Sequence, residues 1–272
     1  MRVRRYGSAG PVVLVLHGGP AAAGEAAPLA RGLATRFQVL EPWQRGSGGA
    51  PLTVARHVAD LAALIAALDA APPPALVGES WGAMLALACA AAHPESCAAL
   101  VLVGCGTFDP DSRAAIPARL AARIDRQTRC ELERLAGLEL DPEERLRRRY
   151  ALLEPLYHVD PLPVEQDPQA PPFDVRAHRE TWADMLREQA RGTYPAAFAA
   201  IRVPVLMLHG AQDPHPGREI HALLRRYMPQ IEYREWARCG HQPWRERHAR
   251  EEFFEQMNAW LHLQLRPKAR NG

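Results

Sequence analysis

The sequence has 272 residues, 47% of them hydrophobic, so it can bury a substantial core, which argues against a disordered protein. Its 33 basic and 31 acidic residues nearly balance and are interleaved, which argues against a nucleic-acid partner. No apolar run approaches the roughly 20 residues of a membrane helix. Five cysteines, an odd number, fit a reducing, cytoplasmic compartment. Neither they nor the histidines show metal-ligand spacing, so we expect no metal and no cofactor.

The first part of the chain alternates predicted strands and helices. Short apolar runs predict strands, and longer runs of helix-forming residues predict helices. The predicted strands are Val12–Leu16, Phe37–Leu40, Ala75–Val77 and Leu100–Val103, and the predicted helices are Ala26–Ala34, Val54–Leu68 and Met84–His93. The run at Val12–Leu16 is too short for the apolar part of a signal peptide. Continuous apolar strands separated by helices predict a mostly parallel sheet with helices on both faces.

The alternation stops after residue 106 and resumes at about residue 199. The stretch between them contains predicted helices at Pro117–Ala136, after Asp141 and at Ala177–Arg191, with a proline-rich segment at Pro155–Pro172. Afterwards come predicted strands at Val203–Leu208 and Ile231–Trp236 and helices at Arg218–Tyr227 and His248–Leu265. We therefore expect a core formed by residues 1–106 and 199–272, interrupted by a helical insertion at 107–198.

The pentapeptide Gly78-Glu79-Ser80-Trp81-Gly82 has the pattern G-x-S-x-G between a predicted strand and a predicted helix. In that context the pattern indicates a nucleophile elbow, a sharp turn that holds the serine hydroxyl out from the sheet. The glycines are needed because larger side chains would collide across the turn. We therefore predict that Ser80 is a catalytic nucleophile.

A serine nucleophile needs a base and an acid that orients the base. Asp213 follows the predicted strand Val203–Leu208, and His241 follows the last predicted strand, so both belong at the carboxyl edge of the sheet where ligands bind. We predict that His241 is the base and Asp213 the acid. Asp109 and Asp111, which follow the fourth predicted strand, are alternative acids.

Backbone amides are expected to stabilise the negative oxygen of the reaction intermediate. The Trp81 amide follows the nucleophile directly, and the loop His17-Gly18-Gly19-Pro20 follows an early strand, where its glycines allow close backbone approach. We predict Gly19 and Trp81 as the oxyanion hole, and Gly18 and Trp81 as substrate contacts. His17 is expected to support this loop rather than act as a base.

These segments together resemble the α/β-hydrolase fold, and within it the proline iminopeptidase branch of serine hydrolases. The resemblance rests on His17–Pro20, Gln44–Gly48, Gly78–Gly82, His209–Asp213 and Gly240-His241. It implies that the insertion forms a helical cap over the site. It also implies that cap carboxylates hold the free amino group of a substrate; the candidates are Glu154, Glu165, Glu180 and Glu188, of which we predict Glu180. Trp43 and Glu79 depart from the family, which usually has Asp and often Gly there.

The sequence thus predicts a serine hydrolase that forms an acyl-enzyme on a small ester or amide, either a small molecule or a short peptide. The resemblance implies an aminopeptidase of the proline iminopeptidase type. A carboxylesterase or lipase-like hydrolase is the first alternative. A non-catalytic binding protein with the hydrolase fold is the second, although such a protein has no need of a complete Ser-Asp-His set.

Overall fold

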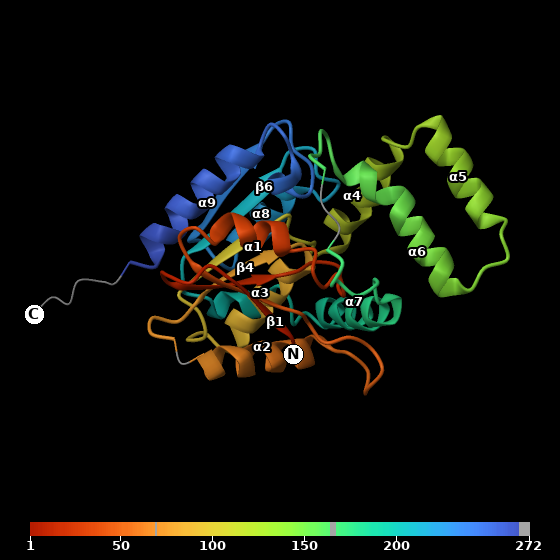
Figure 1. Cartoon of the computed structure of the whole chain (residues 1–272). Helices are drawn as coiled ribbons and strands as arrows, with labels where there is room; N and C mark the ends of the chain where they lie inside the picture. The colour runs from red at the N-terminus through yellow and green to blue at the C-terminus, as the bar shows by residue number, and fades with distance from the viewer. Residues whose placement is uncertain (69, 164–166, 267–272) are drawn as a thin grey trace, which may run out of the picture.

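Seven strands form one sheet at the centre of the molecule, as a computed structural model shows (Figure 1). The structure describes residues 1–68, 70–163 and 167–266. The strands are β1 (Val3–Tyr6), β2 (Val12–Leu16), β3 (Gln38–Pro42), β4 (Ala75–Glu79), β5 (Ala99–Val103), β6 (Val205–Gly210) and β7 (Ile231–Trp236). Their order is β1-β3-β2-β4-β5-β6-β7, and all neighbours are parallel except β1, which runs antiparallel to β3. The mostly parallel sheet predicted from the alternating pattern is confirmed.

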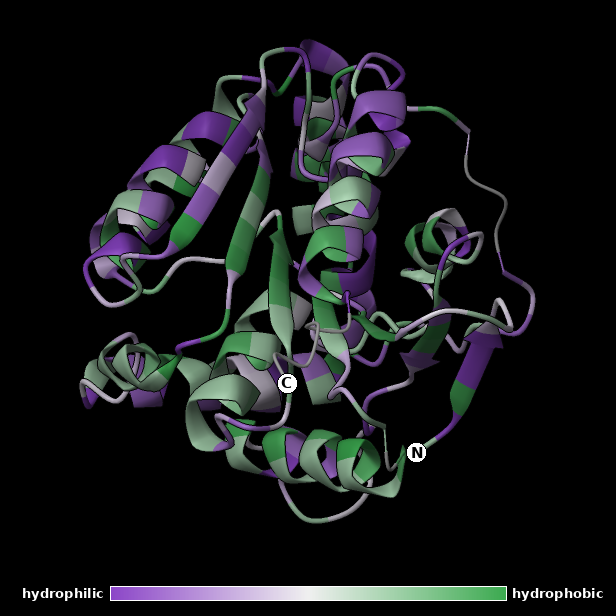
Figure 2. Cartoon of the chain, turned by 90° about the vertical axis from the view of Figure 1, so that its left-hand side faces the viewer, coloured by the Kyte–Doolittle hydropathy of each residue, from purple (hydrophilic) through white to green (hydrophobic). Residues whose placement is uncertain are grey.

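Helices cover both faces of the sheet because successive residues of each strand point to opposite faces. In β2, Leu14 and Leu16 join the core beneath α2 (Val54–Leu68), α3 (Trp81–Ala92) and α8 (Gly217–Arg225). Val13 and Val15 join the second core, beneath α1 (Ala27–Leu33) and α9 (Arg250–Gln264). Figure 2 shows hydrophobic residues concentrated on the central strands, while the outer helices mix hydrophilic and hydrophobic positions.

The stretch between β5 and β6 is helical. It contains α4 (Pro110–Ala121), α5 (Arg126–Ala136), α6 (Pro142–Leu153) and α7 (Val175–Ala190), with short 3₁₀ helices at Glu154–Tyr157 and Ala196–Ala200. In Figure 1, α5 and α6 project to one side of the sheet, whereas α7 lies near α2. No helix of the described residues is both long and apolar enough to cross a membrane.

The prediction of one helix over Pro117–Ala136 is wrong, because the chain turns at residues 122–125 between α4 and α5. The Asp125 carboxylate accepts a hydrogen bond from Thr128 N (2.7 Å), so it caps a new helix. This break was missed because the residues on both sides of it favour a helix. The predicted cap at Asp141 is confirmed, since its carboxylate accepts from the amides of Glu143 and Glu144.

The edge strand β1 is held to the sheet by a buried carboxylate. Glu41, on β3, is fully buried and accepts hydrogen bonds from Arg4 Nε (2.9 Å) and from the Tyr6 hydroxyl (2.7 Å). The Trp43 ring, where the resembled family usually has Asp, lies 4.9 Å from the Arg4 guanidinium carbon. Burial raises the pKa of Glu41, although Tyr6 and Arg4 oppose the shift. Arg4 therefore compensates a charge that has no access to water.

We expect Arg4→Met to lower the free energy of unfolding by about 3 kcal/mol, because it leaves the Glu41 carboxylate buried without its cation. Urea unfolding at pH 7 measures the change. The matched control is Arg5→Met on the same strand, where the side chain is exposed and the change should stay within about 0.5 kcal/mol. Equal midpoints for the two variants would contradict this account.

Candidate active site

Ser80 lies in the turn between β4 and α3 and has φ 52° and ψ −114°. A positive φ is strained for a residue with a Cβ, at a cost of about 1–3 kcal/mol. Ser80 N donates to Val103 O (2.8 Å), which ties the turn to the carboxyl end of β5. The strand-to-helix turn expected from the G-x-S-x-G pattern is therefore present, with Ser80 in the strained position.

The two glycines of the pattern are at points of backbone contact. A Cβ on Gly78 would lie 2.3 Å from Gly82 O, and a Cβ on Gly82 would lie 2.2 Å from Leu16 O, at the end of β2. Both distances are well inside van der Waals contact with backbone atoms that have no freedom to move. The glycines thus let β2, β4 and α3 meet beneath Ser80.

The loop after β2 brings the predicted oxyanion amides near Ser80. A Cβ on Gly18 would lie 3.2 Å from Ser80 Cβ, so this loop runs directly past the serine. Gly19 has φ 111°, a conformation that favours glycine. Trp81 begins α3, where helical amides have no intrahelical acceptor. Neither the Gly19 nor the Trp81 amide donates to another group of the described chain, so both are available to a ligand.

His17 and Gln44 hold this loop in place. His17 Nδ1 donates to Gly18 O (3.0 Å), and His17 Nε2 accepts from Gln44 N (3.1 Å). Burial lowers the pKa of His17 to about 4, so the ring is neutral, as this hydrogen-bond pattern requires. The Trp81 indole donates to Gln44 Oε1 (2.7 Å) and is almost completely buried. The backbone amide is therefore the part of Trp81 that can reach a substrate.

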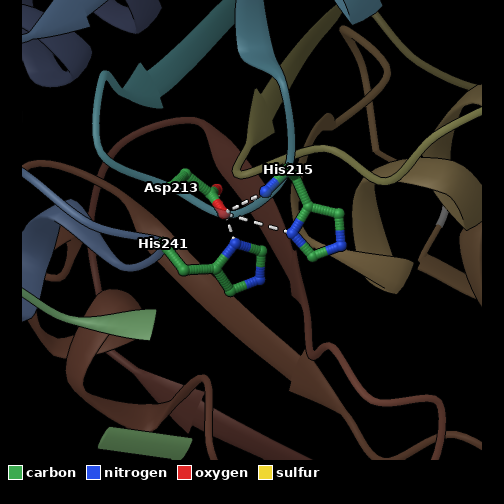
Figure 3. A group of neighbouring side chains, drawn as sticks. All are labelled: Asp213, His215 and His241. Atoms are coloured by element: carbon green, nitrogen blue, oxygen red, sulfur yellow. Dashed lines mark hydrogen bonds and ion pairs between the residues drawn. The ribbon is translucent and has the colours of Figure 1, made fainter. Parts of the chain in front are cut away.

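Asp213 follows β6, and its buried carboxylate bonds to His215 and His241 (Figure 3), with His209 also close to it. Oδ2 accepts from His241 Nδ1 (2.6 Å) and lies 3.1 Å from His209 Nε2. Oδ1 accepts from the backbone amide of His215 (2.8 Å) and from His215 Nδ1 (3.1 Å). Burial would raise the pKa of Asp213, but the imidazoles outweigh it and hold that pKa well below its usual value.

His241 and His215 differ in charge preference although their rings stack, with centroids 4.7 Å apart. Burial lowers the pKa of both rings. For His241 the carboxylate of Asp213 reverses this effect and raises the pKa above its ordinary value. For His215 burial prevails and the pKa stays lowered. His241 is therefore the imidazole of this pair that takes up a proton more readily.

Ser80 and His241 converge on the end of β5. Gly104 follows β5, and a Cβ there would lie 3.0 Å from His241 Nδ1 and 2.7 Å from His241 O. Ser80 N is bonded to Val103, the residue before Gly104. Within the described residues the Ser80 hydroxyl makes no hydrogen bond to His241. The two side chains nevertheless share the carboxyl edge of the sheet, as the strand order implies.

Two residues that the sequence did not single out position the loop of His241. Tyr157 O accepts from His241 N (2.8 Å), and the Tyr157 ring lies 5.5 Å from the His241 ring. The buried Glu246 carboxylate accepts from the amides of Gly240 (3.1 Å), Val159 (3.0 Å) and Asp160 (2.9 Å). No local sequence pattern predicts the contacts to Tyr157, Val159 and Asp160, because each of these contacts joins two segments that are more than 80 residues apart.

The other predicted carboxylates are engaged elsewhere. Glu180 accepts from Leu52 N (2.9 Å) and Arg176 Nε (2.8 Å), on the surface of α7. Asp109 caps α4 through Ser112 N (2.8 Å), and Asp111 is exposed on the same helix. The two remaining candidates of the insertion are Glu188, which is bonded to Arg191 and Thr193, and Glu165, which lies outside the described residues.

Two other carboxyl groups, those of Glu25 and Glu154, lie near the site. No sequence pattern singled out Glu25. Glu25 is an exposed residue, and neighbouring protein atoms remove part of the water around its carboxyl group. This loss of hydration, reinforced by the charges of Glu79 and Glu154, raises the pKa of Glu25 to about 7, and His241 acts on it in the opposite direction. Hydrogen bonds from His158 and Arg245 lower the pKa of Glu154 to about 2.

One group of side chains in the described part of the chain could hold a metal ion. The ligand atoms of Asp213, His215 and His241 lie within 4.8 Å of one another (Figure 3). In the structure the Nδ1 atoms of both imidazoles donate hydrogen bonds to the shared carboxylate of Asp213. An ion would have to replace those protons, so the arrangement as it stands suits proton transfer.

Comparison with known proteins agrees with this architecture. The family model of the alpha/beta hydrolase fold matches residues 11–243. A thermophilic esterase from Thermogutta terrifontis is 24% identical (TM-score 0.63), with 97% of this chain and 93% of that chain covered. Proline iminopeptidase from Mycobacterium smegmatis is 21% identical (TM-score 0.65), with 96% and 94% covered. A search of the curated proteins finds no match. The chain belongs to the alpha/beta hydrolase fold family.

Proposed function

We propose that this protein is a serine hydrolase in which Ser80 is the nucleophile, His241 the general base and Asp213 the orienting acid. The observation that carries the proposal is the 2.6 Å contact between His241 Nδ1 and Asp213 Oδ2, at the same sheet edge as the strained turn of Ser80. A serine hydroxyl is unreactive at neutral pH unless a neighbour takes its proton. The paired imidazole supplies that neighbour.

The proposed reaction runs through an acyl-enzyme. Ser80 Oγ attacks the substrate carbonyl while His241 Nε2 takes its proton, and His241 then protonates the leaving group. Water repeats the sequence to release the acid and free Ser80. Asp213 keeps the Nδ1 proton of His241 in place, so Nε2 faces the reaction as an acceptor. The amides of Gly19 and Trp81 hold the negative oxygen, at a gain of about 3–4 kcal/mol for one such donor.

The insertion at residues 107–198 is proposed to act as a cap over this site. Its Tyr157 contacts His241, and Arg119, on α4, donates to the backbone oxygen of Asp213 (3.5 Å). These contacts to the loops of Asp213 and His241 support the proposal, because both loops carry proposed catalytic groups. A substrate that reaches Ser80 would therefore touch the insertion as well as the sheet.

We propose an amide or peptide substrate with a free amino group, as in an aminopeptidase. Support comes from Glu25 and Glu154, whose charges interact with each other near His241. An ammonium group is the ligand that such a pair of carboxyl groups attracts. Glu154 is already paired with Arg245 (2.7 Å), so Glu25 is the stronger candidate for that contact. A neutral ester, the substrate of the alternative carboxylesterase, would gain nothing from Glu25.

Replacing Ser80 by Ala should abolish labelling by a fluorophosphonate probe and the turnover of p-nitrophenyl acetate, because no other group would form the acyl-enzyme. Mass spectrometry of the labelled peptide identifies the modified serine. Ser8→Ala, at an exposed serine, should label normally. Labelling of the Ser80→Ala protein at another serine would contradict the assignment. Turnover by the unchanged protein would also exclude a non-catalytic binding protein.

Asp213→Asn should lower kcat by about 10⁴-fold, because the amide would face His241 Nδ1 with the wrong hydrogen-bonding pattern. The pH profile is a second readout. His241 must be neutral to accept a proton, and its pKa is raised in the folded protein, so activity should rise with pH through a value above about 6.5. That acid limb should move to lower pH in the variant. Asp109→Asn, which keeps a capping side chain, is the control; a large loss there would move the acid to Asp109.

Glu25→Gln should raise KM for proline naphthylamide about tenfold and leave KM for p-nitrophenyl acetate unchanged, because only the first substrate has an amine. In the unchanged protein, KM for the amine should fall as pH rises through about 7, where Glu25 ionises. Steady-state kinetics with both substrates measures this. Better turnover of the ester, with neither KM altered by the substitution, would favour the carboxylesterase.

A further inference from the structure

Glu79, the residue before the proposed nucleophile, bonds to two other loops of the site. It is 2% exposed, and it belongs to the carboxyl end of β4. Oε2 accepts from Gly18 N (3.0 Å), in the loop after β2. Oε1 accepts from Gln242 Nε2 (2.8 Å), beside His241. One buried carboxylate thus joins three segments that are more than 60 residues apart in the sequence.

We propose that Glu79 is a positioning residue, which aligns the proposed oxyanion amides and the proposed base around Ser80 through these two hydrogen bonds. This inference rests on the serine-hydrolase function proposed above. Glu79 does not touch the reacting atoms in this account. It acts on the loop of Gly18 and Gly19 at one end and on the loop of His241 at the other.

The bond to Gly18 fixes the peptide that precedes the Gly19 amide. Glu79 holds the N–H of the peptide between His17 and Gly18. The next peptide is held through Gly18 O, which accepts from His17 Nδ1 (3.0 Å), and its Gly19 amide stays free for a ligand. The contact leaves no room for a side chain, since a Cβ on Gly18 would lie 2.9 Å from Glu79 Oε2. Glycine at position 18 and a carboxylate at position 79 therefore depend on each other.

The bond to Gln242 continues toward the insertion. Gln242 Oε1 accepts from Arg245 Nη1 (2.9 Å), and the same nitrogen donates to Glu154 Oε1 (2.7 Å). Glu154 opens the 3₁₀ helix that carries Tyr157, whose oxygen holds His241 N. The donors and acceptors alternate without a gap from Gly18 N to Glu154. If the Glu79 carboxylate is replaced by an amide, the NH₂ group at position 79 faces the NH₂ group of Gln242. Two donors then meet where the series now has a donor and an acceptor.

Glu79 also contributes charge to the site. No cation of the described residues forms an ion pair with it, so its field reaches His241, where it favours the protonated imidazole together with Asp213 and Glu25. His215 and Tyr157 face the same ring and are neutral at neutral pH. A carboxylate next to the oxyanion hole opposes negative charge there. The hydrogen bonds that Glu79 accepts from Gly18 and Gln242 offset this unfavourable charge, because they hold the two loops of the proposed site in position.

The experiment compares Glu79→Gln with the double variant Glu79→Gln/Gln242→Glu. In the single variant the new amide can still accept from Gly18 N, but its NH₂ group faces the NH₂ group of Gln242. If Gln242 turns over, its NH₂ group faces Arg245 instead. In the double variant every donor again meets an acceptor, because the carboxylate introduced at position 242 accepts from both sides. Glu232→Gln, at a carboxylate that accepts from the Trp260 indole (2.7 Å), is the control distant from the site.

We expect Glu79→Gln to lower kcat for p-nitrophenyl acetate and the rate of fluorophosphonate labelling about tenfold to hundredfold, with KM changed less than twofold. The acid limb of its pH profile should move to lower pH. The double variant should recover most of kcat, and the control should match the unchanged protein. Urea unfolding of all four proteins shows whether a loss of activity reflects a loss of fold.

A normal kcat and pH profile for Glu79→Gln would overturn the inference and leave the serine-hydrolase proposal intact. A double variant no faster than the single one would also overturn it, because hydrogen bonding would then not be the cause. If the unchanged protein neither turns over the ester nor labels at Ser80, the proposed function fails and this inference fails with it.

Discussion

The close approach of β2, β4 and α3 beneath Ser80 is the constraint on which the rest of the site depends. It requires glycine at positions 78 and 82, where any Cβ would overlap backbone oxygen at about 2.2–2.3 Å. The contact forces Ser80 into a positive φ and starts α3 directly at the sheet edge. The loops after β2, β6 and β7 begin at that same edge, because the carboxyl ends of parallel strands lie on one side of the sheet. The tight turn of Ser80 thus fixes the point toward which the side chains of these loops must be directed.

The Asp213 carboxylate organises the groups that arrive from β6 and β7. Three hydrogen bonds from His215 and His241 reach its two oxygens. His209 Nε2 lies 3.1 Å from Oδ2 and donates to His215 O (3.1 Å). Protonating Asp213 would break several of these bonds at once, which is why its pKa lies so low. The same bonds require a proton on the Nδ1 atoms of His215 and His241. His241 is distinguished from its neighbour by the shorter bond, 2.6 Å against 3.1 Å.

Features with a local cause could be predicted from the sequence, whereas those that depend on distant contacts could not. The helix at Val54–Leu68 has the predicted bounds because apolar periodicity determined it. Asp213 and His241 could be placed together because a parallel sheet brings successive carboxyl ends to one edge. Glu79 and Tyr157 act through contacts with distant segments, and no periodicity or motif encodes the partner. Since charged residues are rarely fully buried unless they are paired, a buried glutamate is informative mainly after its burial is known.

The insertion is bonded to three loops of the proposed site, those of Asp213, His241 and Pro20. Arg119 donates to the backbone of Asp213, Tyr157 O accepts from His241 N, and His178 Nδ1 lies 3.3 Å from Pro20 O in the oxyanion loop. On the far side, Asp184 accepts from Val54 N (2.8 Å). A hinge-like opening of the whole insertion would break these bonds and displace the proposed catalytic groups. The insertion is therefore part of the framework of the proposed site. The positions of His241 and the proposed oxyanion amides depend on the bonds that hold the insertion in place.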